Sequence, residues 1–98
     1  MEITKELKDS SLEISLKGRL DTSTAPQLEE EIKQSISGVK TFTLDLKGLE
    51  YMSSAGLRII LAAQKTMNKQ GKMVIRNVND TIMEVFEMTG FADILTIE

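Results

Sequence analysis

The sequence predicts an α/β domain in which helices pack on a mixed β-sheet of four to five strands. Near the start, apolar and polar residues alternate over residues 3–7 and again over 11–17, a period typical of half-buried strands. After these two runs, stretches with strand spacing and stretches with helix spacing alternate along the chain. This alternation implies crossover connections and the element order β-β-α-β-α-β-α-β. With 98 residues, we expect a single domain spanning residues 1–98.

The first two strands are expected to form a hairpin. The second run has one apolar face, made by Leu12, Ile14 and Leu16. Residues 8–10, with the sequence Lys-Asp-Ser, separate the two runs and predict the turn between them. The period-two pattern therefore predicts that one side of this hairpin packs against the rest of the domain.

A helix is predicted to follow the hairpin. Thr24 and Gln27 match a capping box, and Pro26 stands in the first turn, where its missing N–H costs little. The three glutamates at 29–31 favour the early turns of a helix. Gly38 marks the expected end.

The later elements follow from the same two periods. Strand spacing is found over residues 42–46, and residues 73–75 form a continuous apolar run typical of a buried parallel strand. Residues 94–97 are expected to close the sheet. Helix spacing extends from the serine pair at 53–54 to Gly71, and from residues 79–80 to Gly90.

The composition excludes several classes of function. The chain has neither cysteine nor histidine, so it cannot form a Ser-His-Asp or Cys-His catalytic set, and we expect no metal and no cofactor. Its 12 basic and 15 acidic side chains give a net charge of −3, which argues against nucleic-acid binding. The longest apolar run, residues 59–63, is far shorter than the ~20 residues of a membrane span. Without a signal-peptide pattern at its start, the chain is expected in the cytoplasm.

Residues 45–57 are the segment best suited to a regulatory function. A strand ends there, a short loop follows, and a helix begins at two serines followed by small residues. The free N–H groups at a helix start favour negative charge, so a phosphate on Ser54 would be well placed. Serine is also a preferred N-cap residue, so Ser54 serving only as a cap is the plain alternative.

Two stretches resemble the STAS family of anti-sigma factor antagonists. Residues 18–25, Gly-Arg-Leu-Asp-Thr-Ser-Thr-Ala, are similar to one family segment. Residues 45–57, from Asp45-Leu46 through Tyr-Met-Ser-Ser-Ala-Gly-Leu at 51–57, are similar to the family's strand, loop and serine motif. The resemblance continues through Gly71, Val74 and residues 86–91, and therefore covers nearly the whole chain in order. It implies the STAS fold.

The resemblance also implies a function. In this family the unmodified antagonist binds an anti-sigma factor that is also a serine kinase, phosphorylation breaks the complex, and a serine phosphatase restores it. The acceptor serine lies two positions before the motif glycine, which is Ser54 here. Asp21 corresponds to the family's acidic partner-contact residue. The expected partner-binding residues are Asp21, Thr22, Ser53, Ser54, Ala55, Gly56 and Arg58.

One position departs from the family pattern. Ser53 stands where many members have aspartate, which makes Ser53 the alternative acceptor for the phosphate. Arg58, Lys65 and Lys69 lie on one helical stripe that adjoins Ser54; this stripe is either a solvated helix face or a surface for an acidic partner.

Two other functions remain open on sequence grounds. The chain could be a STAS scaffold that is never phosphorylated, as a subunit of a sensory or transport assembly. An enzyme would have to rely on carboxylates, lysine or Tyr51, and the best polar cluster is Asp21, Asp45 and Glu50. Nothing in the sequence connects this cluster to a substrate, so we expect no enzymatic activity.

Overall fold

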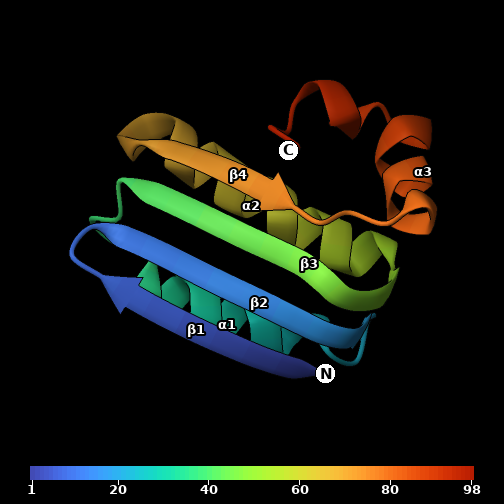
Figure 1. Ribbon diagram of the computed structural model, residues 1–98, viewed down its shortest axis with the longest axis horizontal. Helices are drawn as coiled ribbons and strands as arrows, with labels where there is room; N and C mark the ends of the chain where they lie inside the picture. Colours follow the sequence, from blue (N-terminus) through green and yellow to red (C-terminus); the bar gives the residue numbers. More distant parts are fainter.

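The computed structural model describes all residues, 1–98. Four strands form one sheet in the order β1-β2-β3-β4, and they are β1 (Glu2–Lys8), β2 (Ser11–Leu20), β3 (Thr41–Met52) and β4 (Lys72–Arg76). The helical elements are α1 (Ala25–Ser35), α2 (Ser54–Gln70), α3 (Asp80–Met88) and the 3₁₀ helix η1 (Phe91–Asp93). Strand β1 is antiparallel to β2, whereas β2, β3 and β4 are parallel (Figure 1), which confirms the predicted mixed sheet.

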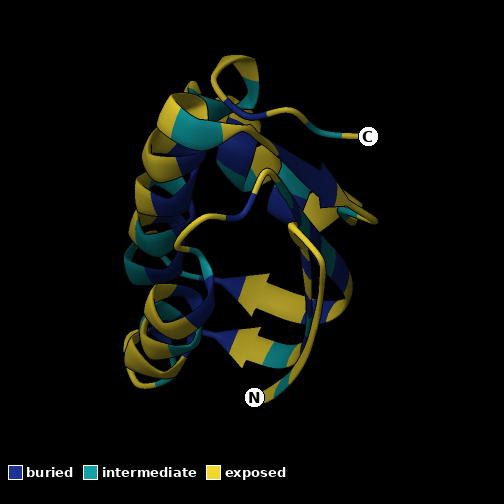
Figure 2. Cartoon of the chain, turned by 90° about the vertical axis from the view of Figure 1, so that its left-hand side faces the viewer, coloured by how far each residue is buried: buried dark blue, intermediate teal, exposed yellow.

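The helices α1 and α2 cover one face of the sheet. Figure 2 shows the helices as one layer and the strands as another. The side chains of β2 and β3 that point towards the helices are fully buried, and they are Leu12, Ile14, Leu16, Phe42, Leu44 and Leu46. Their polar neighbours along the strands point to the open face, as a period of two requires.

The two central strands are longer than their alternation predicts. Register shifts in the β2–β3 ladder lie between Ser15 and Lys17 and between Gly18 and Arg19, and Gly18 has φ = +104°. Bulges of this kind interrupt the alternation while the pairing continues. The ladder therefore extends to Leu20 opposite Met52, so β2 and β3 end side by side.

The predicted closing strand at 94–97 is wrong. This segment makes only one isolated bridge, between Ile75 and Ile97. The N–H groups of Ile94 and Leu95 both donate to the carbonyl of Phe91 in the turn of η1, so they are not available to a strand partner. The observed order is therefore β-β-α-β-α-β-α followed by η1, with the C-terminal segment beside β4 (Figure 1).

None of the helices in this structure is both long enough and apolar enough to cross a bilayer.

Candidate functional site

The candidate site is built where β2 and β3 end together. The backbone N–H of Ser53 donates to the carbonyl of Leu20 at 2.8 Å, which ties the residue after β3 to the last residue of β2. The turn that starts at Asp21 and the helix that starts at Ser54 therefore leave the sheet from adjacent strands. This arrangement brings the two motif segments, which are far apart in the sequence, to the same end of the sheet.

Ser53, and not Ser54, is the N-cap of α2. Ser53 has extended backbone angles, φ = −91° and ψ = 172°, and its Oγ accepts a hydrogen bond from the N–H of Gly56 at 3.4 Å. The extended backbone and the donor three residues on are those of a serine N-cap, and the bond is a long one. The hypothesis that Ser54 serves only as a cap is therefore wrong, because its neighbour already has that role.

Ser54 is an exposed residue at the start of α2. It is the first residue of the helix, and its hydroxyl makes no hydrogen bond within the chain. Together with Leu57, Arg58 and Leu61 of the same helix and Thr89 and Phe91 beyond α3, it lines a groove of about 250 Å³. The hydroxyl is thus accessible from outside the molecule.

The small residues after Ser54 let the helix approach the sheet closely. Gly56 is buried, and a Cβ at this position would lie 2.4 Å from the Leu20 Cγ and 3.3 Å from the Leu20 carbonyl oxygen. Ala55 is partly buried beside it. A larger residue at 56 would move the start of α2 away from the end of β2, so the glycine sets the position of Ser54.

Asp21 organises the turn between β2 and α1. Its Oδ1 accepts hydrogen bonds from the Ser23 hydroxyl at 2.7 Å, the Ser23 N–H at 3.0 Å and the Thr24 N–H at 3.2 Å. These bonds, led by that from the Ser23 hydroxyl, favour the charged carboxylate and hold the pKa of Asp21 below its ordinary value. Thr22, at the tip of this turn, is exposed.

The capping box predicted at the start of α1 does not form. Thr24 is the N-cap residue, but its side chain makes no cap hydrogen bond. Instead, its hydroxyl donates to the carbonyl of Arg19 at 2.8 Å and accepts from the N–H of Asp21 at 2.9 Å. The Thr24 hydroxyl therefore stabilises the turn before the helix and not the helix start itself.

Arg19 and Tyr51 form a surface pair beside Asp21 that sequence reasoning missed. They are partners in the β2–β3 ladder, and the guanidinium lies 4.3 Å from the centre of the Tyr51 ring, a cation–π distance. Arg19 also approaches the Asp21 carboxylate at 4.0 Å. The bulge between Gly18 and Arg19 sets this pairing, and the one local signal of the bulge is Gly18 itself, since an isolated glycine in a strand often marks one.

Arg58 and Lys65 lie on the exposed side of α2, and neither makes an ion pair. Both line a second groove, of about 490 Å³, which continues from the groove at Ser54. Lys69 is exposed on the same helix but lines neither groove.

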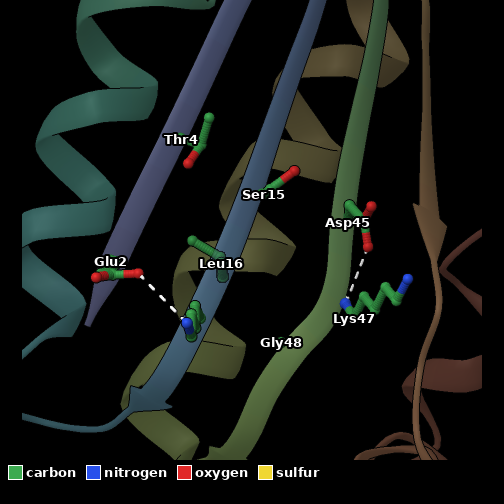
Figure 3. A pocket seen from close by; sticks show the side chains of 8 residues that line it. Glu2, Thr4, Ser15, Leu16, Asp45, Lys47 and Gly48 are labelled. Atoms are coloured by element: carbon green, nitrogen blue, oxygen red, sulfur yellow. Dashed lines mark hydrogen bonds and ion pairs between the residues drawn. The ribbon is translucent and has the colours of Figure 1, made fainter.

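The acidic cluster considered for an enzyme is not brought together. Asp45 faces the open side of the sheet, where it accepts from the Lys47 N–H and from Asn77 Nδ2, each at 2.9 Å. These bonds, led by that from Asn77, hold its pKa below the ordinary value. Figure 3 shows it beside Lys47, with Ser15 on the neighbouring strand. Asp45 lies seven residues before Met52, the strand end next to Asp21, which is roughly 20 Å along a strand. Asp45 therefore does not form one cluster with Asp21.

Comparisons with known proteins identify the family. The family model described as "STAS domain" matches residues 2–98. The anti-sigma-B factor antagonist of Listeria monocytogenes is 32% identical over 104 residues, covering 100% of this chain and 90% of that protein. The corresponding antagonist of Staphylococcus aureus is 30% identical over 99 residues, covering 99% of this chain and 92% of that protein. This chain belongs to the STAS domain family.

The solved structures agree on the fold. The anti-sigma factor antagonist SpoIIAA in its unphosphorylated form superposes with a TM-score of 0.84 at 22% identity, covering 99% of this chain and 88% of that one. An anti-sigma factor antagonist from Mycobacterium paratuberculosis gives 0.88 at 23% identity, covering 98% and 83%. The phosphorylated form of SpoIIAA, from Bacillus, gives 0.78 at 22% identity, covering 99% and 91%. The four-stranded mixed sheet with helices is therefore the STAS fold.

Proposed function

We propose that this chain is an anti-sigma factor antagonist whose binding is switched off by phosphorylation of Ser54. Unphosphorylated, it binds an anti-sigma factor that is also a serine kinase, and so releases a sigma factor. A serine phosphatase that acts on phospho-Ser54 restores binding. Because sigma factors act on RNA polymerase, this function belongs in the cytoplasm.

The observation that carries the proposal is the free hydroxyl at the start of α2. Ser54 is exposed and unbonded, while the cap is supplied by Ser53. A kinase can therefore reach the Ser54 oxygen without removing a hydrogen bond of the fold. The Ser53 hydroxyl is half-buried and already bonded in the cap, so Ser53 is the less accessible acceptor.

A phosphate at Ser54 is compatible with the folded domain. It would add about −1.5 to −2 charges beside the N–H groups of the helix start, where negative charge is stabilised. The fold would therefore remain intact while the surface changes its charge. A partner that docks over this position would have to take the new charge out of water, and desolvation of a phosphate dianion is costly.

The proposed binding surface surrounds this serine. It combines the turn at Asp21 and Thr22 with the residues at the start of α2, Ser53 to Gly56, and with Arg58 one turn further on. Asp21 is held ionised by its hydrogen bonds, so it presents a fixed negative charge to the partner. Arg58 presents the opposite charge in the hollow that it shares with Ser54.

The proposal is tested by measuring the affinity of the cognate anti-sigma factor for four forms of the chain: wild type, phosphoserine at 54, Ser54→Asp and Ser54→Ala. We expect Ser54→Ala to bind as wild type does. Phosphoserine should weaken binding by several hundredfold, which corresponds to about 3–4 kcal/mol, and Ser54→Asp by less because it carries less charge.

A second arm tests the acceptor itself. Incubation with the kinase and ATP, followed by peptide mapping of residues 48–58, should find the phosphate on Ser54. Ser53→Ala should still be phosphorylated, and Ser54→Ala should not. If all forms bind equally well, or if no phosphate is incorporated, the chain would instead be an unswitched STAS scaffold.

A further inference from the structure

A continuous groove runs beside α2 from Ser54 towards the C-terminal segment. It is formed by two hollows, of about 250 Å³ and about 490 Å³, which share Arg58, Leu61 and Phe91. We call this surface the α2–η1 groove. Lys65 and Ile94 lie in its larger part, and Ser54 lies at its other end.

The walls of the α2–η1 groove are partly apolar. Leu61 of α2 and Phe91 of η1 are only partly buried, and Ile94 is 55% exposed. The 94–97 segment leaves Ile94 in this position because the turn of η1 prevents it from forming a full strand. Exposed apolar side chains that gather in one groove are typical of an interaction site.

The charge of the α2–η1 groove is opposite to that of the whole chain. The net charge is −3, yet no acidic residue lines either hollow, and two cations, Arg58 and Lys65, do. Neither cation has an ion-pair partner within the chain. The three other hollows of the surface each contain at least one carboxylate. Charge complementarity therefore favours an acidic occupant.

A buried amide adds a polar feature to this groove. Gln64 lines the larger hollow and is only 5% exposed, and its Oε1 is buried without a hydrogen-bond partner. Its Nε2 donates to Asn68 Oδ1 at 2.8 Å. An unpaired buried acceptor is unfavourable. If a peptide in the groove offered a backbone N–H to the Gln64 Oε1, the new hydrogen bond would stabilise the complex.

We propose that the α2–η1 groove binds an acidic, partly apolar peptide segment of the anti-sigma factor. This inference rests on the proposed function and names the chemistry of the partner at that site. From Ser54 to Lys65 is eleven helical residues, or about 16 Å, which an extended peptide of about five residues would span. Arg58 and Lys65 are separated by about 10 Å along the helix, so they would pair with carboxylates about three residues apart in such a peptide.

The groove also connects partner binding to Ser54. Arg58 follows Ser54 by four residues, so the two side chains lie on the same face of α2 and line the same hollow. A phosphate on Ser54 would bind the Arg58 guanidinium, since arginine pairs strongly with phosphate. The peptide carboxylate would then lose its cation and meet a like charge. Phosphorylation would thus close one end of the groove to an acidic segment.

The test uses the full chain and its purified cognate anti-sigma factor, with affinity measured by calorimetry. Lys65→Glu and Ile94→Ser are the decisive variants, because both residues lie in the groove but outside the surface immediately around Ser54. We expect each to weaken binding at least tenfold. Lys8→Glu is the matched charge control, since Lys8 is exposed, unpaired and on β1, at the opposite edge of the sheet from β4; its affinity should change by less than twofold.

A photo-crosslinker at position 94 identifies the occupant. The crosslinked partner peptide should contain at least two Asp or Glu residues within about five positions; a basic peptide, or no crosslink in a complex that forms, would overturn the proposal. If wild type, Lys65→Glu and Ile94→Ser bind equally, the groove is not a docking site, while the proposed function stands. If wild type fails to bind any anti-sigma factor, both proposals fall.

Discussion

Gly56 of α2 lies directly against Leu20, the last residue of β2, with no room for a side chain between them. A Cβ at 56 would come within 2.4 Å of the Leu20 Cγ and 2.7 Å of its Cδ2. Leu20 is fully buried, so it has no solvent-filled space into which it can move. This contact, together with the hydrogen bond from the Ser53 N–H to the Leu20 carbonyl, holds the helix start at the strand end.

Gly56→Ala should therefore destabilise the domain. Inserting a methyl group into a packed contact typically costs about 1–3 kcal/mol, and this is the expected loss in the free energy of unfolding. Denaturant titration measures it. In the double variant Leu20→Ala, Gly56→Ala, the alanine at 56 gains room, so the combined loss should be smaller than the sum of the two single losses. Simple additivity would show that the close contact has no energetic consequence.

Alanine substitutions of Ser53 and Ser54 should have different effects on the free energy of unfolding. Ser53→Ala removes the cap acceptor of the Gly56 N–H and should lower the free energy of unfolding by about 1 kcal/mol. Ser54→Ala removes a hydroxyl with no partner and should change it by less than about 0.5 kcal/mol. Chemical denaturation of both variants under identical conditions decides the matter. Equal losses, or a larger loss for Ser54→Ala, would contradict the assignment of the cap to Ser53.

The Asp21 carboxylate should make the stability depend on pH in the acid range. Its pKa is lowered in the folded state by hydrogen bonds from Ser23 and Thr24, so the unfolded chain binds this proton at higher pH than the folded one. The stabilisation is thus present above the ordinary pKa of 3.8 and is lost as the pH falls below it, through the folded pKa.

Comparison with Asp21→Asn isolates this effect. The difference in unfolding free energy between wild type and Asp21→Asn should be constant near neutral pH and should shrink as the pH falls below about 4. An NMR titration of the Asp21 carboxyl carbon should give a pKa below 3.8 in the folded protein. A difference that stays constant into acid would show that the turn does not favour the charged form.

The second pKa of a phosphate at Ser54 should show whether Arg58 binds it. Phosphoserine has a second pKa of about 6, and a cation that binds the dianion lowers it. In protein carrying genetically encoded phosphoserine at 54, a ³¹P titration should show this lowered pKa, and Arg58→Gln should raise it again. Lys65→Gln, two helical turns further on, is the control and should leave it nearly unchanged. This measurement requires neither kinase nor partner. An unchanged pKa in Arg58→Gln would mean that the guanidinium does not bind the phosphate.

Much of the fold could be predicted because its signals are local. The period of two in residues 11–17 and the apolar run at 73–75 were sufficient to predict β2 and β4, and both are confirmed. The glycine at 71 correctly marked the end of α2. The tertiary structure adds a second requirement for glycine at 71, because a Cβ there would meet the carbonyl of Lys40, from a different part of the chain.

The errors arose where a nearby turn uses the hydrogen-bonding group that the pattern had assigned to a helix cap or a strand. Thr24 and Gln27 satisfied the capping-box pattern, but the Thr24 hydroxyl bonds to Arg19 and Asp21 instead. Residues 94–97 have strand composition, but the turn of η1 uses two of their N–H groups. In each case the pattern described what the residues can do, and the neighbouring groups decided which hydrogen bonds are made.

The amino-acid sequence by itself determined the α/β class, the order of the elements up to α3 and the location of Ser54 at the start of a helix, because periodicity and capping residues act within one turn or one strand. The tertiary structure decided which serine caps α2, how far β2 and β3 extend, and which exposed side chains share the α2–η1 groove. Those features depend on bulges, on close contacts such as that of Gly56 with Leu20, and on the absence of acidic neighbours around Arg58 and Lys65. Except for the cap bond, which joins Ser53 to Gly56 three residues on, they require distances between residues far apart in the chain, which no local pattern contains.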